Sequence, residues 1–249
     1  MKVKNILISQ PTPETEKNPY SELAQKYNVH FEFRQFIKIE GVSAKELRKE
    51  RVNFLDFTAV IFTSKTAIDH YFRLCEEMRV TVPETMRYLC MSESVALYLQ
   101  KYIVYRKRKI AFGNGKFDDL IKLIQKYKTE SFLVPLSDIH NQEIPNKLAK
   151  ENVQFRSVVL YRTVSNDVKD IDISFYDTIV FFSPGGIKSL FENFPGFVQG
   201  EKYIGGFGST THAAIKEAGL RLDIMAPRPE APSMIMALDQ FLSEVKKKK

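Results

Sequence analysis

The sequence has only two cysteines in 249 residues, Cys75 and Cys90, and their spacing matches no metal-binding pattern. So few cysteines indicate a reducing, intracellular compartment. Long apolar runs are also missing, which disfavours a membrane span. The first residues, MKVKNILISQPTP, form a short strand-like run followed by prolines, and this is not the pattern of a signal peptide. We therefore expect a cytoplasmic protein with no membrane partner.

Three motifs of common enzyme classes are missing as well. A nucleophile elbow needs a glycine two residues before its serine, but Phe181 stands two residues before Ser183. No glycine-rich loop is followed by the Lys-Ser/Thr pair of a P-loop. In GGFGSTTHAAIKEAG, Thr211 stands where a dinucleotide-binding loop has its third glycine. The sequence therefore does not indicate a serine nucleophile, a P-loop or a dinucleotide site.

Positive charge is in excess, with a formal net charge of +7. Two basic runs contribute to it, YRKRK at 105–109 and KKKK at 246–249. We interpret both runs as solvated surface. Nucleic-acid binding is disfavoured, because the aromatic-interleaved basic stripe of a single-strand binder is absent. A positive protein can instead attract a small polyanionic substrate.

The two halves of the chain resemble each other at an offset close to half its length. The stretch IFTSKTAIDHYF at 61–72 aligns with FFSPGGIKSLF at 181–191, so that Ser64 corresponds to Ser183. Three further pairs follow the same scheme: 89–99 with 206–216, 111–124 with 226–242, and 24–31 with 149–155. The repeated unit contains short apolar strands, Ser/Thr-rich turns and helices with one apolar stripe.

Alternating strands and helices are typical of a parallel α/β sheet, so we expect two similar α/β domains. Two extended segments of mixed polarity, 34–41 and 157–165, are expected to connect the domains. One domain would then be discontinuous, with residues 1–33 and 166–249, and would contain both termini. Residues 42–156 would form the inserted domain.

Hydroxyl side chains stand where the expected strands end and the next helices begin: Ser64, Ser183, Ser209 and Thr210. Such hydroxyls cap helices, and capping alone can explain them. The unpaired backbone N–H groups beside them also attract anions, and open α/β sheets bind ligands beyond the carboxyl ends of their strands. Two interpretations therefore stay open, helix capping alone and a site for a carboxylate- or phosphate-rich ligand in a cleft between the domains.

Five stretches together resemble the uroporphyrinogen-III synthase family in order and spacing: FTSKTAI, FFSPGGI, VVLYRT, GFGSTTHAAIKEAGL and APRPEAPSMIMAL. The ordered set, and no single stretch, carries this resemblance across nearly the whole chain. It implies two α/β domains joined by a two-stranded β-ladder, with a cleft between them. It also implies a hydro-lyase of haem biosynthesis, without a metal or an organic cofactor. Such an enzyme cyclises hydroxymethylbilane to uroporphyrinogen III, with inversion of ring D and loss of water.

The resemblance also implies roles for single residues. Tyr161 in VVLYRT matches the family tyrosine proposed to hydrogen-bond the departing hydroxyl. Because a phenol is a weak acid at neutral pH, we expect hydrogen-bond assistance and not full proton donation. The alternative role of Tyr161 is that of a structural strand tyrosine. Substrate carboxylates are expected to meet hydroxyl and N–H groups at Ser64, Ser94, Ser183, Gly185, Ser209, Thr210 and Thr211.

The sequence departs from the family pattern at several positions. Lys65 and Ser209 stand where proline is usual, and Met91 stands where glycine is frequent. Glu230 lies near a usual threonine and adds a negative charge. We expect these departures to change individual contacts more than the reaction.

As partners we expect the small-molecule substrate hydroxymethylbilane and no nucleic acid. The chain is expected to be a monomer that contacts hydroxymethylbilane synthase transiently. Two alternatives remain. One is a non-catalytic cytoplasmic two-domain binder of a small polyanionic ligand. The other is a different enzyme on the same scaffold, such as a sugar-phosphate isomerase, although no convincing set of carboxylates or histidines stands at the expected strand ends.

Overall fold

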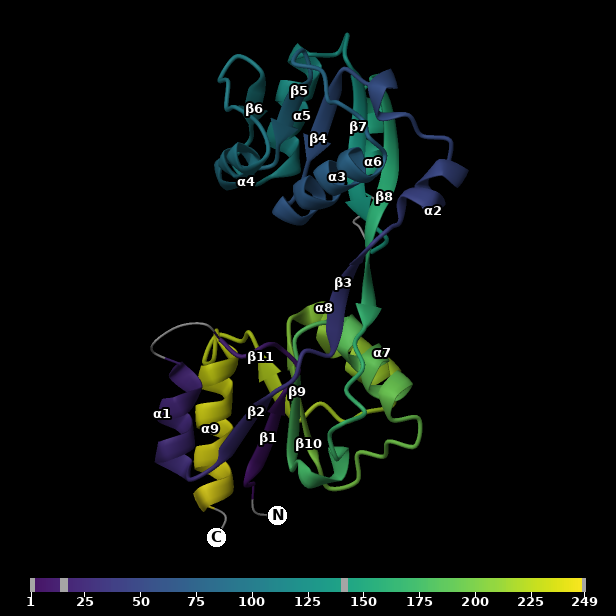
Figure 1. The fold of residues 1–249 in the computed structure, drawn as a ribbon. Helices are drawn as coiled ribbons and strands as arrows, with labels where there is room; N and C mark the ends of the chain where they lie inside the picture. Colours follow the sequence, from purple (N-terminus) through teal and green to yellow (C-terminus); the bar gives the residue numbers. More distant parts are fainter. Residues whose placement is uncertain (1–2, 14–17, 140–142, 248–249) are drawn as a thin grey trace. The chain divides into compact units, whose positions relative to one another are not determined.

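The computed structural model describes residues 3–13, 18–139 and 143–247. The chain forms two compact units, which we call unit 1 (Met1–Lys38 with Val164–Lys249) and unit 2 (Ile39–Thr163) (Figure 1). Each unit is an α/β fold around one sheet, so the predicted fold class is confirmed. The finer division into domains and connections, the ladder linker and the cleft stay predictions.

Unit 1 contains a five-stranded sheet in the order β11-β10-β9-β1-β2, and all its pairings are parallel. Its strands are β1 (Asn5–Ile8), β2 (His30–Phe33), β9 (Thr178–Phe181), β10 (Tyr203–Phe207) and β11 (Ile224–Ala226). Its helices are α1 (Pro19–Tyr27), η3 (Ile173–Phe175, a 3₁₀ turn), α7 (Pro184–Asn193), α8 (Ser209–Glu217) and α9 (Met234–Lys247).

Unit 2 is built around a six-stranded sheet in the order β3-β8-β7-β4-β5-β6. Its strands are β3 (Ile37–Gly41), β4 (Ala59–Phe62), β5 (Arg87–Cys90), β6 (Ile110–Phe112), β7 (Ser131–Ser137) and β8 (Gln154–Ser165). Its helices are α2 (Ala44–Lys49), η1 (Phe54–Asp56), α3 (Lys65–Glu77), α4 (Glu93–Tyr98), η2 (Leu99–Lys101), α5 (Phe117–Lys126) and α6 (Glu143–Lys150). The points where the chain passes between the units lie within β3 and β8.

The two sheets repeat one order of strands. The order β11-β10-β9-β1-β2 in unit 1 corresponds to β6-β5-β4-β7-β8 in unit 2, with β3 added beside β8. Unit 1 takes β1 and β2 from the N-terminal part of the chain, whereas β7 and β8 come last in unit 2. The similar sequence stretches therefore occupy equivalent strands and helices in the two sheets, although the order of these elements along the chain differs between the units.

Apolar side chains alternate between the two faces of each sheet, because successive residues of a strand point to opposite faces. In β4, Val60 and Phe62 pack in a cluster with α3 and α4, whereas Ala59 and Ile61 pack with α5 and α6. Unit 1 has the same layers, with α1 and α9 on one face of its sheet and α7 and α8 on the other (Figure 1). Both faces of each sheet are thereby covered, which is usual for parallel sheets.

Three observations bear on the composition. Cys75 and Cys90 are free and buried. Across residues 3–13, 18–139 and 143–247, we find no helix with the length and apolar character needed to span a bilayer. The same ranges contain no group of three or more His, Cys, Asp or Glu residues placed to hold a metal ion.

Close packing around β10 gives a first prediction. A Cβ atom on Gly206 would lie 2.7 Å from Ile215 Cδ1 and 3.0 Å from His212 Cδ2. We expect Gly206→Ala to lower the free energy of unfolding by about 1–3 kcal/mol through overpacking. Gly196→Ala is the matched control, because a Cβ there meets nothing within 4 Å. Urea denaturation of both variants checks this, and equal effects would contradict the packing described.

Candidate functional site

Two corresponding helices begin in the same way in the two units. Ser64 is the N-cap of α3, two residues after the end of β4, and its Oγ accepts a hydrogen bond from the N–H of Ala67 at 3.1 Å. Ser183 is the N-cap of α7, two residues after the end of β9, and its Oγ accepts from the N–H of Gly186 at 3.3 Å. Both serines therefore cap helices, and the N–H groups of the first turn that they leave unpaired lie at the carboxyl ends of the strands.

Glycines make the start of α7 compact. A Cβ on Gly185 would lie 3.3 Å from Ile37 Cγ2, and one on Gly186 would lie 3.1 Å from Phe181 Cδ1. Pro184 fixes the backbone at the first helical position and has no N–H of its own. The N–H of Gly185 is therefore the first one that this helix offers to a ligand.

The other predicted positions lie in different settings. Gly208, with φ of 90°, is the N-cap of α8, so the expectation that Ser209 or Thr210 caps this helix is wrong. The positive φ favours glycine at that position. With Gly208 as the N-cap, Ser209 and Thr210 lie in the first turn of α8, where both are exposed. Thr211 is buried, with 1% of its surface exposed. Ser94 lies in the first turn of α4, and its Oγ is 3.0 Å from Ser92 Oγ.

Tyr161 lies next to Ser64 in unit 2. The phenol oxygen of Tyr161 is 3.1 Å from Ser64 Oγ, within hydrogen-bond distance. Strand β8 shifts its register against β7 between Leu136 and Ser137, so that Leu136 pairs with Val159 and Ser137 with Tyr161. Such a bulge re-aims side chains, and here the consecutive residues Leu160 and Tyr161 pack in the same apolar cluster.

His70 covers the ring of Tyr161, and the sequence analysis did not single it out. The two rings stack with their centroids 5.2 Å apart and an interplanar angle of 16°. Arg73 Nε donates to His70 Nδ1 at 3.2 Å, which places the proton of the neutral imidazole on Nε2. Burial and, to a smaller extent, the charge of Arg73 lower the pKa of His70 below its ordinary value of 6.5. The stacked imidazole is therefore neutral at physiological pH.

The end of β3 and the residue after it, Val42, lie against the side chains of Arg73 and His70. Arg73 Nη2 donates to the carbonyl oxygen of Val42 at 2.7 Å, and the N–H of Val42 donates to the carbonyl of Leu160 at 2.9 Å. A Cβ on Gly41 would lie 2.6 Å from Arg73 Nη2 and 2.8 Å from His70 Nδ1. Glycine at this position therefore permits the close approach of the Arg73 and His70 side chains to β3.

A second polar cluster lies along α3 and α4. The carboxylate of Asp69 accepts hydrogen bonds from Tyr98, at 3.0 Å, and from Tyr102, and it pairs with Lys101 Nζ at 2.9 Å. Burial raises the pKa of Asp69, but these donors outweigh burial and lower the pKa overall. Lys65 Nζ lies 5.4 Å from the centroid of the Tyr98 ring and forms no ion pair with a described carboxylate. The departure at Lys65 thus places a cation beside the start of α3.

The other departures lie at turns. The carbonyl of Met91 accepts a hydrogen bond from the N–H of Gly115, and a Cβ on Gly113 would lie 3.2 Å from the same oxygen. Glu230 is exposed, and its backbone carbonyl accepts from Gln240 Nε2 at 2.7 Å. These contacts of Met91 and Glu230 do not involve the turns that carry Ser64 and Ser183.

The structure thus brings together some of the predicted residues. In unit 2, Ser64 and Tyr161 are in contact, and Ser94 follows the neighbouring strand β5. In unit 1, Ser183 follows β9 and Thr210 follows the neighbouring strand β10. Each unit by itself offers hydroxyl and backbone N–H groups beyond the carboxyl ends of its strands, and such groups can bind carboxylates.

Three comparisons with known proteins agree. A sequence model of the family described as uroporphyrinogen-III synthase HemD matches residues 18–236. A uroporphyrinogen-III synthase of Saccharomyces cerevisiae is 26% identical over 152 residues, which cover 52% of this chain and 54% of the yeast protein. The match thus spans about half the length of that curated relative.

Solved structures resemble the fold along almost the whole chain. A uroporphyrinogen-III synthetase of Helicobacter pylori has a TM-score of 0.59 at 16% identity, with 97% of this chain and 99% of that chain covered. A mutant uroporphyrinogen III synthase of Thermus thermophilus has a TM-score of 0.53 at 14% identity, with 99% and 100% covered. At these identities the likeness concerns the fold alone.

The family model matches most of the chain, from residue 18 to residue 236. The chain therefore belongs to the uroporphyrinogen-III synthase HemD family. The family predicted from the sequence is thereby confirmed. The roles of single residues stay predictions.

The neutral His70 gives a prediction about pH. Since the folded pKa is lowered, the folded state binds fewer protons than the unfolded chain as the pH falls. The contribution of His70 to the free energy of unfolding is therefore complete above pH 6.5. It is lost as the pH falls through the lowered pKa of His70 in the folded protein. We expect His70→Gln to lose less free energy of unfolding than the parent between pH 7.5 and pH 5.5. Urea denaturation at both pH values, with the exposed His30→Gln as control, measures the difference, and an unchanged pH dependence would contradict it.

Proposed function

We propose that this chain cyclises hydroxymethylbilane to uroporphyrinogen III, with inversion of ring D and loss of water. The match of the family model to residues 18–236 is the observation that carries the proposal. The contact between Tyr161 and Ser64 supports it, because it holds a phenol and a hydroxyl at the carboxyl end of β4.

The reaction needs help for a departing hydroxyl group. Once this group leaves, the substituted carbon of ring D attacks the resulting azafulvene, and the spiro intermediate fragments and recloses. Ser64 Oγ already accepts from the N–H of Ala67, so its own O–H can donate to the phenol oxygen of Tyr161. The phenol O–H is then left to donate to the departing hydroxyl, and donors in such a chain strengthen one another.

The helix starts would hold the carboxylates of the substrate. In the proposal, the N–H groups at Gly185 and Thr210 bind carboxylates in unit 1, and those after Ser64 do so in unit 2. Holding a flexible linear tetrapyrrole so that the hindered carbon attacks is mainly a matter of positioning. Lys65, beside Ser64, adds a positive charge to this binding.

We propose that the chain works as a cytoplasmic monomer, in transient contact with hydroxymethylbilane synthase. Its two free cysteines support a reducing compartment.

Removal of the Tyr161 hydroxyl tests its role. We expect Tyr161→Phe to lower kcat about tenfold or more, because hydrogen-bond assistance to the leaving group is lost. The His70 stack needs only the ring, so the free energy of unfolding should change by about 1 kcal/mol or less. Steady-state kinetics and urea denaturation give both values. Unchanged kinetics would remove Tyr161 from the mechanism.

Substitution of Ser183 separates capping from substrate binding. Aspartate is as good an N-cap as serine, so Ser183→Asp should keep the stability, whereas Ser183→Ala should lose about 1 kcal/mol. A carboxylate at this position repels those of the substrate, and we expect KM to rise about tenfold or more in Ser183→Asp.

The exposed Thr81→Asp, in the segment before β5, is the matched control for added negative charge. If Ser183→Asp kept both the stability and the KM of the parent, Ser183 would be a helix cap alone.

A coupled assay tests the proposed reaction itself. Hydroxymethylbilane is generated in situ, the purified protein is added, and the uroporphyrin isomers are separated after oxidation. Without the enzyme the substrate closes to isomer I, so we expect predominant isomer III. Isomer I alone from folded protein would overturn the proposal and favour a non-catalytic binder of a polyanionic ligand.

A further inference from the structure

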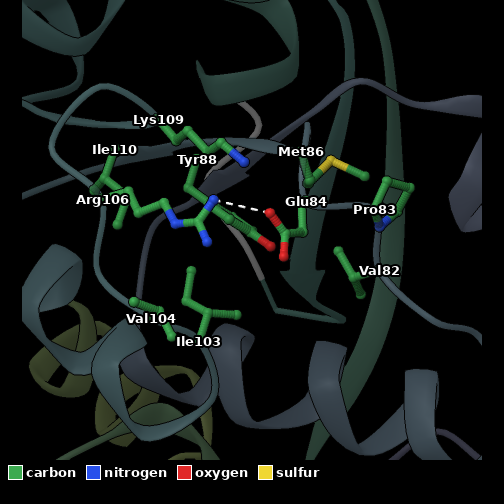
Figure 2. A pocket seen from close by; sticks show the side chains of 10 residues that line it. All are labelled: Val82, Pro83, Glu84, Met86, Tyr88, Ile103, Val104, Arg106, Lys109 and Ile110. Carbon is green, nitrogen blue, oxygen red and sulfur yellow. Dashed lines mark hydrogen bonds and ion pairs between the residues drawn. The ribbon is translucent and has the colours of Figure 1, made fainter.

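Unit 2 contains a pocket of about 180 Å³ at its edge strand, which is below the usual size of sites for drug-sized ligands and suits a smaller molecule (Figure 2). Its walls come from two segments that precede neighbouring strands. Pro83 and Met86 lie just before β5, and Ile103 and Lys109 lie just before β6. The pocket therefore lies at the amino ends of β5 and β6.

This position separates the pocket from the proposed reaction site. The turns that carry Ser64 and Ser94 follow the carboxyl ends of β4 and β5. Since β4, β5 and β6 are parallel, their amino ends lie at the opposite edge of the sheet. The pocket is therefore a different site from the one proposed for the reaction.

The walls of the pocket are mainly apolar. Met86 and Ile110 are buried with 2% and 6% of their surface exposed, and they form its inner part. Val104 lies at its rim with 77% of its surface exposed. An apolar body that covered Val104 and contacted Ile103 would remove this surface from water, which is favourable.

Two polar groups in the pocket lack partners. Tyr88 is a core residue with 4% of its surface exposed, and its phenol oxygen takes part in none of the hydrogen bonds between described residues. Burial raises the pKa of Tyr88, so the phenol stays protonated and can donate. Lys109 Nζ, in turn, forms no ion pair with the described carboxylates. The N–H of Tyr88 donates to the carbonyl of Lys109 at 2.8 Å, so both residues start from adjacent backbone.

The charge at the pocket favours an anion. Arg106 Nη1 pairs with Glu84 Oε2 at 2.8 Å, and Figure 2 shows these two side chains meeting in the pocket. Arg106 and, to a smaller extent, Lys109 lower the pKa of Glu84, the one carboxylate among the lining residues, so the two cations of the pocket exceed its negative charge by one. Lys109 is the last residue of the basic run 105–109.

We propose that this pocket binds a small amphiphilic carboxylate, with its apolar body against Met86, Ile103 and Ile110 and its carboxylate at Tyr88 and Lys109. The proposal concerns binding and does not depend on the cyclisation. A carboxylate there accepts one hydrogen bond from the phenol and one from the ammonium group, which gives each unpartnered group its partner.

Octanoate is the probe for the test, and octylammonium and octan-1-ol are matched probes with the same apolar body and a different charge. Titrations of the full chain are followed by NMR with labelled isoleucine and methionine methyl groups. We expect saturable shifts at Ile103, Ile110 and Met86 with octanoate, and clearly weaker binding of the other two probes. Shifts spread evenly over the methyl groups of both units, or equal binding of octylammonium, would overturn the proposal.

Variants test the two polar contacts. We expect Lys109→Gln to weaken octanoate binding about fivefold. Tyr88→Phe keeps the ring that stacks on Phe62 and should weaken binding by about the same factor. Lys107→Gln is the control, because Lys107 belongs to the same basic run but does not line the pocket. If Lys109→Gln and Tyr88→Phe bound octanoate as tightly as the control does, the carboxylate of the ligand would not lie at Tyr88 and Lys109.

Discussion

Parallel pairing of the strands is the constraint on which the rest of the structure depends. It places the carboxyl ends of neighbouring strands at one edge of each sheet, and the helices that follow begin at that edge. Ser64 and Ser183 can therefore cap corresponding helices in the two units. The same geometry leaves the amino ends of β5 and β6 free to form a pocket of a different kind. One topology, used twice, thus supplies every place at which we propose binding.

Within unit 2, a local irregularity positions the residue that we propose to assist the reaction. The register shift opposite Ser137 lets Leu160 and Tyr161 face the same apolar cluster. His70 then covers one face of the Tyr161 ring, and Gly41 leaves room for His70 beside β3. The orientation of the phenol therefore depends on contacts between segments far apart in the sequence.

The sequence predicted what local patterns determine. Alternation of strands and helices predicted the fold class, and the spacing in FTSKTAI and FFSPGGI predicted that Ser64 and Ser183 stand at helix starts. Ser209 and Thr210 also stand at a helix start, but Gly208 is the N-cap there, so neither hydroxyl caps α8. The sequence could not give the contact of His70 with Tyr161, since only the bulge in β8 and the pairing of β3 bring them together. Nor could it show that Lys109 shares a pocket with Tyr88.

The central claim is that helix starts at the carboxyl edge of both sheets bind the carboxylates of a tetrapyrrole. Backbone amide NMR with uroporphyrin III, a polycarboxylate that cannot undergo the reaction, tests this claim most directly. The account predicts saturable shifts at Gly185 and Thr210 in unit 1 and at Thr66 in unit 2. Shifts confined to the basic run 105–109, or to one unit alone, would contradict it.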